Sequence, residues 1–149
     1  MEDLERYLDE IVDPTIKEFE QNPTSVRHAF LACVATFHSV DYLAYDREND
    51  RPRKGRVGNL RKKFGEQSVD FYRIDQIAHA FKHVVSDGQS KVSAKEVVTR
   101  PAGFLDVSFY YDVSRYDDPV GGVTLNNNRN FDVLEILKNA MAFLRSVRT

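Results

Sequence analysis

The stretch Val69–Ser86 most constrains the fold, because its apolar residues recur at spacings of three and four. At about 3.6 residues per turn, this spacing places them on one side of an α-helix, where they can face a hydrophobic core. These residues are Ile74, Ile77, Ala78, Phe81 and Val85. A polar stripe on the opposite side consists of Tyr72, Gln76, His79 and His83. The sequence therefore predicts an amphipathic helix whose polar side could bond and titrate.

The hydrophobic period changes from helical to two-fold after Asp87-Gly88. Between 104 and 113, apolar and polar residues alternate strictly, which is typical of a strand with one buried face. Two further strands are predicted at about 92–99 and 120–125. Because the last connection, at 114–119, is short and rich in turn residues, we expect antiparallel pairing.

The remaining apolar patterns predict helices at about 2–21, 24–45, 59–86 and 130–147. We expect a kink or break at Asp13-Pro14, helix starts at Asn22-Pro23 and Asn130, and a turn around Gly65. Residues 24–45 are apolar on nearly all sides, which favours a central position. The fold class is therefore α+β and mainly α: a helical bundle with a small antiparallel two- to three-stranded sheet inserted before the C-terminal helix, in a single domain over 1–149.

Composition limits the function classes. The chain has 149 residues and a formal net charge of −2, so no global charge favours nucleic acid or an anionic membrane. Its acidic first residues do not suit a signal peptide and no apolar run is long enough to span a bilayer, so we expect a soluble cytoplasmic protein and no membrane partner. Cys33 is the only cysteine, which excludes an intramolecular disulfide. No motif calls for a cofactor.

Four polar residues could form a metal site. His79 and His83 are four positions apart on one helix, and His38 and Asp41 are three apart on another. Imidazole and carboxylate groups at such spacings can share an ion between two helices. The alternative, which we favour, is that these polar residues bond one another between helices, as buried polar groups generally do.

Arg73 and His79, with five residues between them, provide a second candidate site. Here the sequence resembles the HEPN superfamily, whose helical bundles often carry an Arg-x(4–6)-His motif. The resemblance covers about 24–86 and implies a metal-independent ribonuclease of the toxin or phage-defence type. Arg73 would then bind the phosphate and His79 would act as acid and base. Because six positions rotate His79 by about 240° from Arg73, a joint site would need two protomers.

The chain departs from that family in two ways. Ile74 follows the arginine, where the family usually has a polar residue, and a predicted sheet and a whole helix follow the motif, which normally lies near the end of the bundle. The wider layout also resembles a group of uncharacterised bacterial proteins with an Ala-x-x-Lys-His type of element, here within Ala78–His83. That second resemblance implies the fold and no particular activity. In this context we expect Lys82 and His83 to mark the end of a helix.

The stretch 51–63 is a candidate polyanion site. It carries seven basic side chains and no acidic one: Arg51, Arg53, Lys54, Arg56, Arg61, Lys62 and Lys63. Such a run can contact phosphates, but it holds no aromatic residue to stack on a base, and acidic residues precede it. Nucleic-acid binding is therefore an open alternative that we do not favour.

No catalytic constellation in the sequence is specific. We therefore interpret the chain as a small interaction or regulatory module without catalysis of its own. A HEPN-like ribonuclease or its inactive relative, and a metal-binding helical bundle, are the alternatives. A homodimer is compatible with the sequence, and the identity of a protein partner does not follow from it.

Overall fold

The computed structural model describes residues 2–46, 51–52, 55–83, 92–100, 121–126 and 131–147. The chain begins with α1 (Glu2–Tyr7), the π-helical turn η1 (Leu8–Val12) and α2 (Asp13–Gln21), followed by α3 (Val26–Ala44). A short strand pair, β1 (Tyr45–Asp46) and β2 (Arg51–Pro52), precedes α4 (Arg56–Gln67) and α5 (Val69–His83). The 3-10 turn η2 (Ala94–Glu96), β3 (Val97–Arg100), β4 (Gly122–Leu125) and α6 (Val133–Ser146) complete the order.

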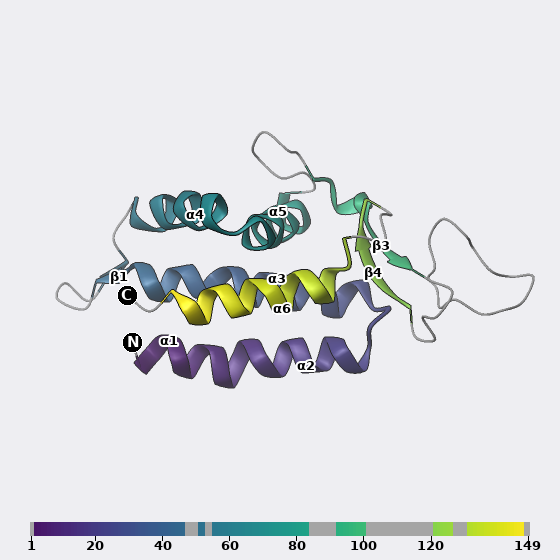
Figure 1. The fold of residues 1–149 in the computed structure, drawn as a ribbon, viewed down its shortest axis with the longest axis horizontal. Helices are drawn as coiled ribbons and strands as arrows, with labels where there is room; N and C mark the ends of the chain where they lie inside the picture. The colour runs from purple at the N-terminus through teal and green to yellow at the C-terminus, as the bar shows by residue number, and fades with distance from the viewer. Residues whose placement is uncertain are drawn as a thin grey trace, which may run out of the picture.

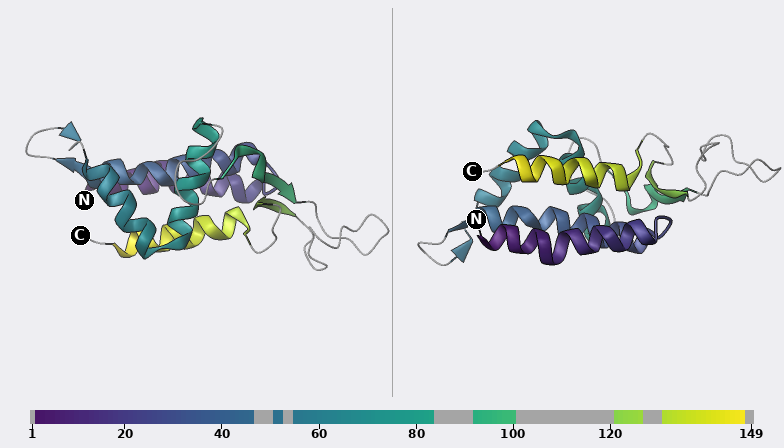
Figure 2. Two further views of the ribbon diagram at one scale, coloured as in Figure 1. Left: turned by 90° about the horizontal axis from the view of Figure 1, so that it is seen from above. Right: turned by 60° about the horizontal axis from the view of Figure 1, so that its bottom comes forward.

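The helices form a bundle with the small sheet at one end (Figure 1). The α1–η1–α2 segment runs alongside α3, and α6 lies next to both. In contrast, α5 crosses over α3 and α6, as the view from above shows (Figure 2). β3 and β4 lie at the end of the bundle farthest from both termini. This arrangement confirms the predicted mainly helical α+β fold with a small antiparallel sheet before the last helix.

The N-terminal helix passes Asp13-Pro14 without the predicted break. The amide of Asp13 donates to the carbonyl of Leu8, five residues earlier, so a π turn precedes the proline. Pro14 then stands in the first turn of α2, where its missing N–H costs little. The wider turn also suits the spacing of four between the buried residues Leu4, Leu8, Val12 and Ile16.

Several predicted helix ends are wrong by a few residues. α3 begins after Ser25, whose hydroxyl accepts the amide of His28, and Asn22-Pro23 lies in the preceding turn. Gly65 lies inside α4, and the break between α4 and α5 is at Ser68, where the backbone is extended. α4 also starts at Arg56, three residues before the predicted position. Local capping chemistry therefore set these ends, and apolar spacing could not locate them.

The sheet is joined to α6 by a charged contact. β3 and β4 pair antiparallel, with Val97 opposite Leu125 and Arg100 opposite Gly122. Asp132, not Asn130, caps α6, and its carboxylate lies 3.3 Å from Arg100. A Cβ on Gly122 would lie 2.8 Å from that carboxylate and 2.9 Å from the guanidinium, so a larger residue would displace the ion pair. The predicted strand at 104–113 lies outside the described residues.

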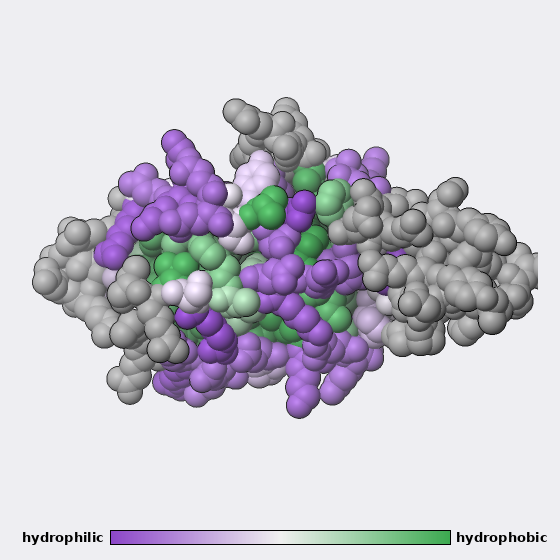
Figure 3. Space-filling model, viewed as in Figure 1, coloured by the Kyte–Doolittle hydropathy of each residue, from purple (hydrophilic) through white to green (hydrophobic). Residues whose placement is uncertain are grey.

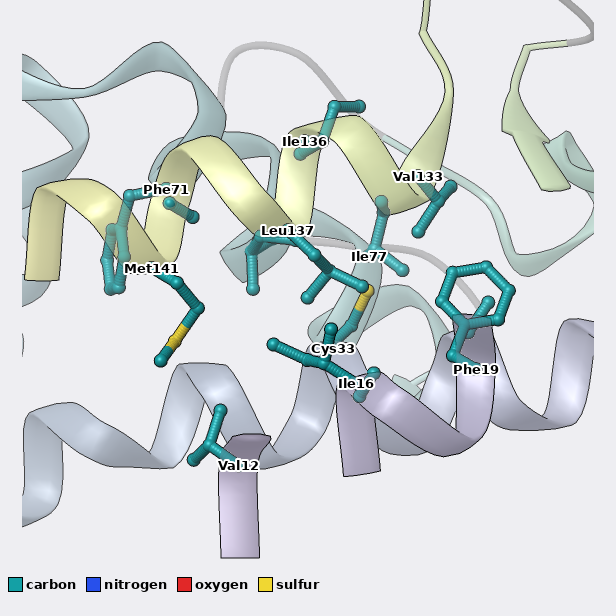
Figure 4. Close-up of a cluster of buried hydrophobic side chains, with 14 of the residues drawn as sticks. Val12, Ile16, Phe19, Cys33, Phe71, Ile77, Val133, Ile136, Leu137 and Met141 are labelled. Carbon is teal, nitrogen blue, oxygen red and sulfur yellow. The ribbon is translucent and has the colours of Figure 1, made fainter. Parts of the chain in front are cut away.

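The core lies where α6 covers the other long helices (Figure 4). Leu137 and Met141 of α6 point toward Val12, Ile16 and Cys33, which come from the N-terminal helix and α3. Phe64, Phe71 and Phe143 form a second contact group, with edge-to-face ring centroids 5.4–5.5 Å apart at Phe64. Burial of these large side chains is the main stabilising contribution to the bundle.

Candidate functional site

The polar stripe of α5 faces α4 and α3, so most of it is enclosed by other helices. Tyr72 packs on Gly65 of α4, where an added Cβ would lie 3.3 Å from its ring. Gln76 is buried, and the side chain of His79 is only 16% exposed. His83, one turn further along, is exposed. The predicted second stripe therefore forms an inter-helix contact that reaches the surface at its last member.

Asp75 is the centre of this contact. Its carboxylate is nearly buried and accepts hydrogen bonds from Arg61 of α4, at 2.9 Å from Nη2 to Oδ1 and 3.3 Å from Nε to Oδ2. The guanidinium therefore grips both carboxylate oxygens, which is the strong, directional form of this ion pair. The pair links α4 to α5 across the break at Ser68.

His79 completes the cluster from one turn further along α5. Its Nδ1 lies 2.8 Å from Oδ1 of Asp75 and 3.0 Å from the backbone carbonyl of the same residue. Both neighbours are acceptors, so Nδ1 carries a proton, and in the neutral ring the lone pair is on Nε2. The imidazole is held in one tautomer and one orientation, as in a carboxylate–histidine dyad.

Phe37 of α3 forms the third wall of the cluster. The guanidinium carbon of Arg61 lies 5.1 Å from the centre of this ring, within the range of a cation–π contact. The imidazole of His79 meets the same ring edge-on, with centroids 5.1 Å apart. We call Phe37, Arg61, Asp75 and His79 the junction cluster, because it ties α3, α4 and α5 together.

Sequence reasoning missed three of these four residues. Asp75 stands four positions before His79, a spacing that places two side chains on one helix face, and this signal could have identified the pair. Arg61 was grouped with the basic stretch, since nothing in the sequence indicates its distant partner. Phe37 lies in the stretch 24–45, which is apolar on nearly all sides, so nothing in the pattern distinguishes it.

Arg73 lies in a different environment. It donates to Asp70 at 2.7 Å, and its guanidinium carbon stacks 4.4 Å from the ring centre of Phe131, just before α6. Asp70 also accepts a hydrogen bond from Asn139 of α6. Arg73 thus faces α6, whereas His79 faces α3 and α4. The structure does not bring the two residues together within one chain.

The four metal candidates are not gathered either. His38 bonds Asp41 at 2.6 Å on the exposed side of α3, with about half of each side chain accessible. His79 and His83 have ring centroids 6.0 Å apart. Within the part of the chain that the structure describes, no group of three or more His, Cys, Asp or Glu side chains is placed to hold an ion.

The basic stretch is divided by the fold. Arg61 points inward to Asp75, whereas Arg56, Lys62 and Lys63 are exposed along α4. Arg51 lies in β2, and Arg53 and Lys54 are outside the described residues. Cys33 is fully buried in the core, and burial raises the pKa of its thiol well above the usual range. A thiol held neutral in this way is a poor nucleophile.

No protein-family model matches the chain, and neither curated proteins nor solved structures provide a match. Among the described helices, none combines the length and apolar character that crossing a bilayer requires. The chemistry available to the site must therefore be judged from its geometry. An oriented imidazole beside a carboxylate can accept a proton. Here, however, the carboxylate of Asp75 also binds Arg61, and the imidazole of His79 also packs against Phe37.

Proposed function

We propose that the chain is a small interaction or regulatory module of the cytoplasm, without catalysis of its own. One observation carries the proposal: the side chains best suited to chemistry are used to hold helices together. His79 and Asp75 join α5 to α4 and α3, and Arg73 joins α5 to the start of α6. A catalytic group must reach a substrate, and these groups instead meet one another.

A metal-independent ribonuclease related to HEPN proteins is the second candidate. The Asp75–His79 pair favours it, because a carboxylate that fixes Nδ1 leaves Nε2 as the position for proton transfer. Arg73 could contribute only from another protomer. A metal-binding bundle is a third candidate, but no observation among the described residues favours it.

The deciding experiment incubates the purified protein with total RNA in the presence of a chelator. We expect no cleavage at any protein concentration, and the variants R73A and H79A should match the wild type in this assay. H79A should also unfold at a lower urea concentration, because it removes a brace between helices. Cleavage by the wild type that H79A abolishes, with its fold retained by circular dichroism, would establish the ribonuclease and refute the module.

A further inference from the structure

Exposed apolar side chains gather on the outer side of α3. Five large hydrophobic residues of the described chain are exposed, and three belong to this region: Leu31 at 39%, Tyr42 at 42% and Tyr45 at 37%. α3 turns its other side to the core, where Ala32, Cys33 and Thr36 are fully buried. Figure 3 views the molecule from the side of α6, where hydrophobic surface lies between polar side chains. The outer side of α3 faces away from α6.

The apolar surface continues onto the N-terminal helix. The hydroxyl of Tyr7 donates to the carbonyl of Ala35 at 2.8 Å, and its ring stacks on Tyr42 at 4.2 Å between centroids. Ile11 follows Tyr7 one turn later on the same helix. Ile11 is 47% exposed and is the fourth of the five residues. A contiguous apolar surface of this kind marks an interaction site, whereas singly exposed apolar residues are ordinary.

The charges along α3 indicate which partner fits. Arg27, Val34 and Asp41 are spaced by seven residues, so they lie in one line along the helix. Arg27 is exposed and forms no ion pair with any other described residue. The side chain of Asp41, one oxygen of which bonds His38, is 47% exposed. The line therefore carries a cation at one end, an anion at the other and an apolar residue in the middle. When two such helices are placed antiparallel, the cation of each lies opposite the anion of the other.

We infer that two copies of this chain pair through the outer sides of α3, antiparallel, about a two-fold axis at Val34. This inference rests on the proposed function and names the partner of the module. Arg27 of each copy meets Asp41 of the other, on either side of the axis. The seam from 27 to 45 is about 27 Å long, at 1.5 Å per residue. An isologous contact of this kind closes after two subunits.

The pairing is distinct from a joint ribonuclease site. Arg73 contacts Phe131 and Asp70, on the side of α5 that meets α6. The proposed axis passes through the opposite side of α3. The two Arg73 side chains of the dimer therefore lie far from the axis, and this dimer builds no shared Arg–His centre.

Charge reversal tests the register. Sedimentation equilibrium should show a dimer for the wild type. R27D and D41R should each weaken the dimer at least about tenfold, because each places two like-charged pairs across the axis, and R27D/D41R should restore it to within about threefold. K62E, on exposed α4, is the matched control and should not change the dimer. A wild type that stays monomeric at every concentration reached, or a double variant that does not recover, would overturn the pairing.

A cysteine substitution provides an independent test of the axis. V34C should form an intermolecular disulfide with itself under mild oxidation, whereas A142C, on the exposed side of α6, should not. Cys33 does not interfere, because it is fully buried. Equal cross-linking of both variants would contradict the axis. If the protein passes these tests as a dimer but cleaves RNA, the proposed function is refuted and the pairing stands. If it is a monomer and does not cleave RNA, the pairing is refuted and the proposed function stands.

Discussion

Two charged clusters join helices in this protein. The shared group at the centre is a carboxylate in one cluster and a guanidinium in the other. In the junction cluster, one carboxylate, Asp75, is shared by Arg61 and His79. In the second cluster, one guanidinium, Arg145 of α6, is shared by three carboxylates of the N-terminal helix. Its Nη2 lies 2.7 Å from Asp13 and 3.1 Å from Asp9, and its Nη1 lies 3.4 Å from Glu5. We call this group the acidic ladder.

The acidic ladder depends on the π turn. Glu5, Asp9 and Asp13 are spaced by four residues, and in a regular helix each would be rotated by about 40° from the one before. The wide turn at Leu8–Val12 reduces this drift, so that all three face one guanidinium. Asp9 and Asp13 raise the pKa of Arg145, chiefly through the hydrogen bond with Asp9.

The comparison indicates that the contribution of such a cluster to stability depends on the burial of its charges more than on the number of its ion pairs. The ladder has three pairs, but its acidic side chains are 47–63% exposed, so water competes for every charge. Asp75 is 9% exposed, so little water reaches this ion pair, and removing the carboxylate leaves the charge of Arg61 without compensation. We expect the cluster with fewer ion pairs to contribute more to stability.

The largest effect is expected from D75A. It leaves Arg61 and His79 next to each other without their shared carboxylate, and should lower the free energy of unfolding by about 3 kcal/mol. The estimate is at the lower end for broken buried pairs, because Arg61 is 31% exposed and water can partly solvate it. Urea unfolding followed by circular dichroism measures the change.

Two controls sharpen this result. D9A removes a carboxylate from the acidic ladder and should cost less than about 1 kcal/mol. R61L/D75L removes both charges of the junction cluster and should recover much of the stability lost in D75A, because no unpaired charge is left. A D75A variant no less stable than D9A would contradict the comparison.

A smaller effect is expected from R145A. It releases three carboxylates that can all be hydrated, so the loss should be about 1–2 kcal/mol at low salt. The loss should shrink in 1 M salt, where the Debye length is only about 3 Å. Urea unfolding at both salt concentrations measures this. A loss independent of salt would mean that Arg145 stabilises the bundle through the packing of its stem.

The smallest effect is expected at Tyr7, which joins the N-terminal helix to α3 without a charge. Burial, and then the neighbouring Tyr42 and Asp41, raise its pKa from 10.0 to about 12. The folded state therefore favours the neutral phenol. This stability is fully present below about pH 10 and is lost as the pH rises through about 12.

Y7F should be less stable than the wild type by about 1 kcal/mol at pH 8, because it loses the hydrogen bond to Ala35. It also lacks the group that ionises, so the difference between the two proteins should narrow between pH 10 and 12. Urea unfolding across this range tests the sign. A difference that does not narrow as the pH rises would show that the fold tolerates ionised Tyr7.

Much of the architecture could be predicted from local patterns. The stripe of Ile74, Ile77 and Ala78 faces the core as predicted. The strands predicted at about 92–99 and 120–125 are present as β3 and β4, although β3 begins only at Val97. Helix ends were harder to locate, because Ser25 and Asp132 act through one or two hydrogen bonds to nearby amides, and neighbouring Asn and Pro residues give a similar signal. The break at Ser68 left no apolar signal.

The candidate site could be predicted only in part. Periodicity placed His79 on a polar stripe and separated it from Arg73 by rotation, and the structure assigns the two residues to different contacts. The role of Arg61 could not be predicted, because its partner Asp75 is 14 positions away on another helix. The same holds for Arg145, whose partners Glu5, Asp9 and Asp13 lie 132 to 140 positions away.

Local patterns in the sequence predicted most of the helices, their approximate positions and their apolar sides, because these properties depend on residues within a few turns of one another. Packing between distant parts of the chain decides which charges meet, which of them are buried, and that Leu31 and Tyr42 of α3 stay exposed. The physical reason is that a charge has no preferred partner until packing brings one within reach and removes the water that would otherwise solvate it.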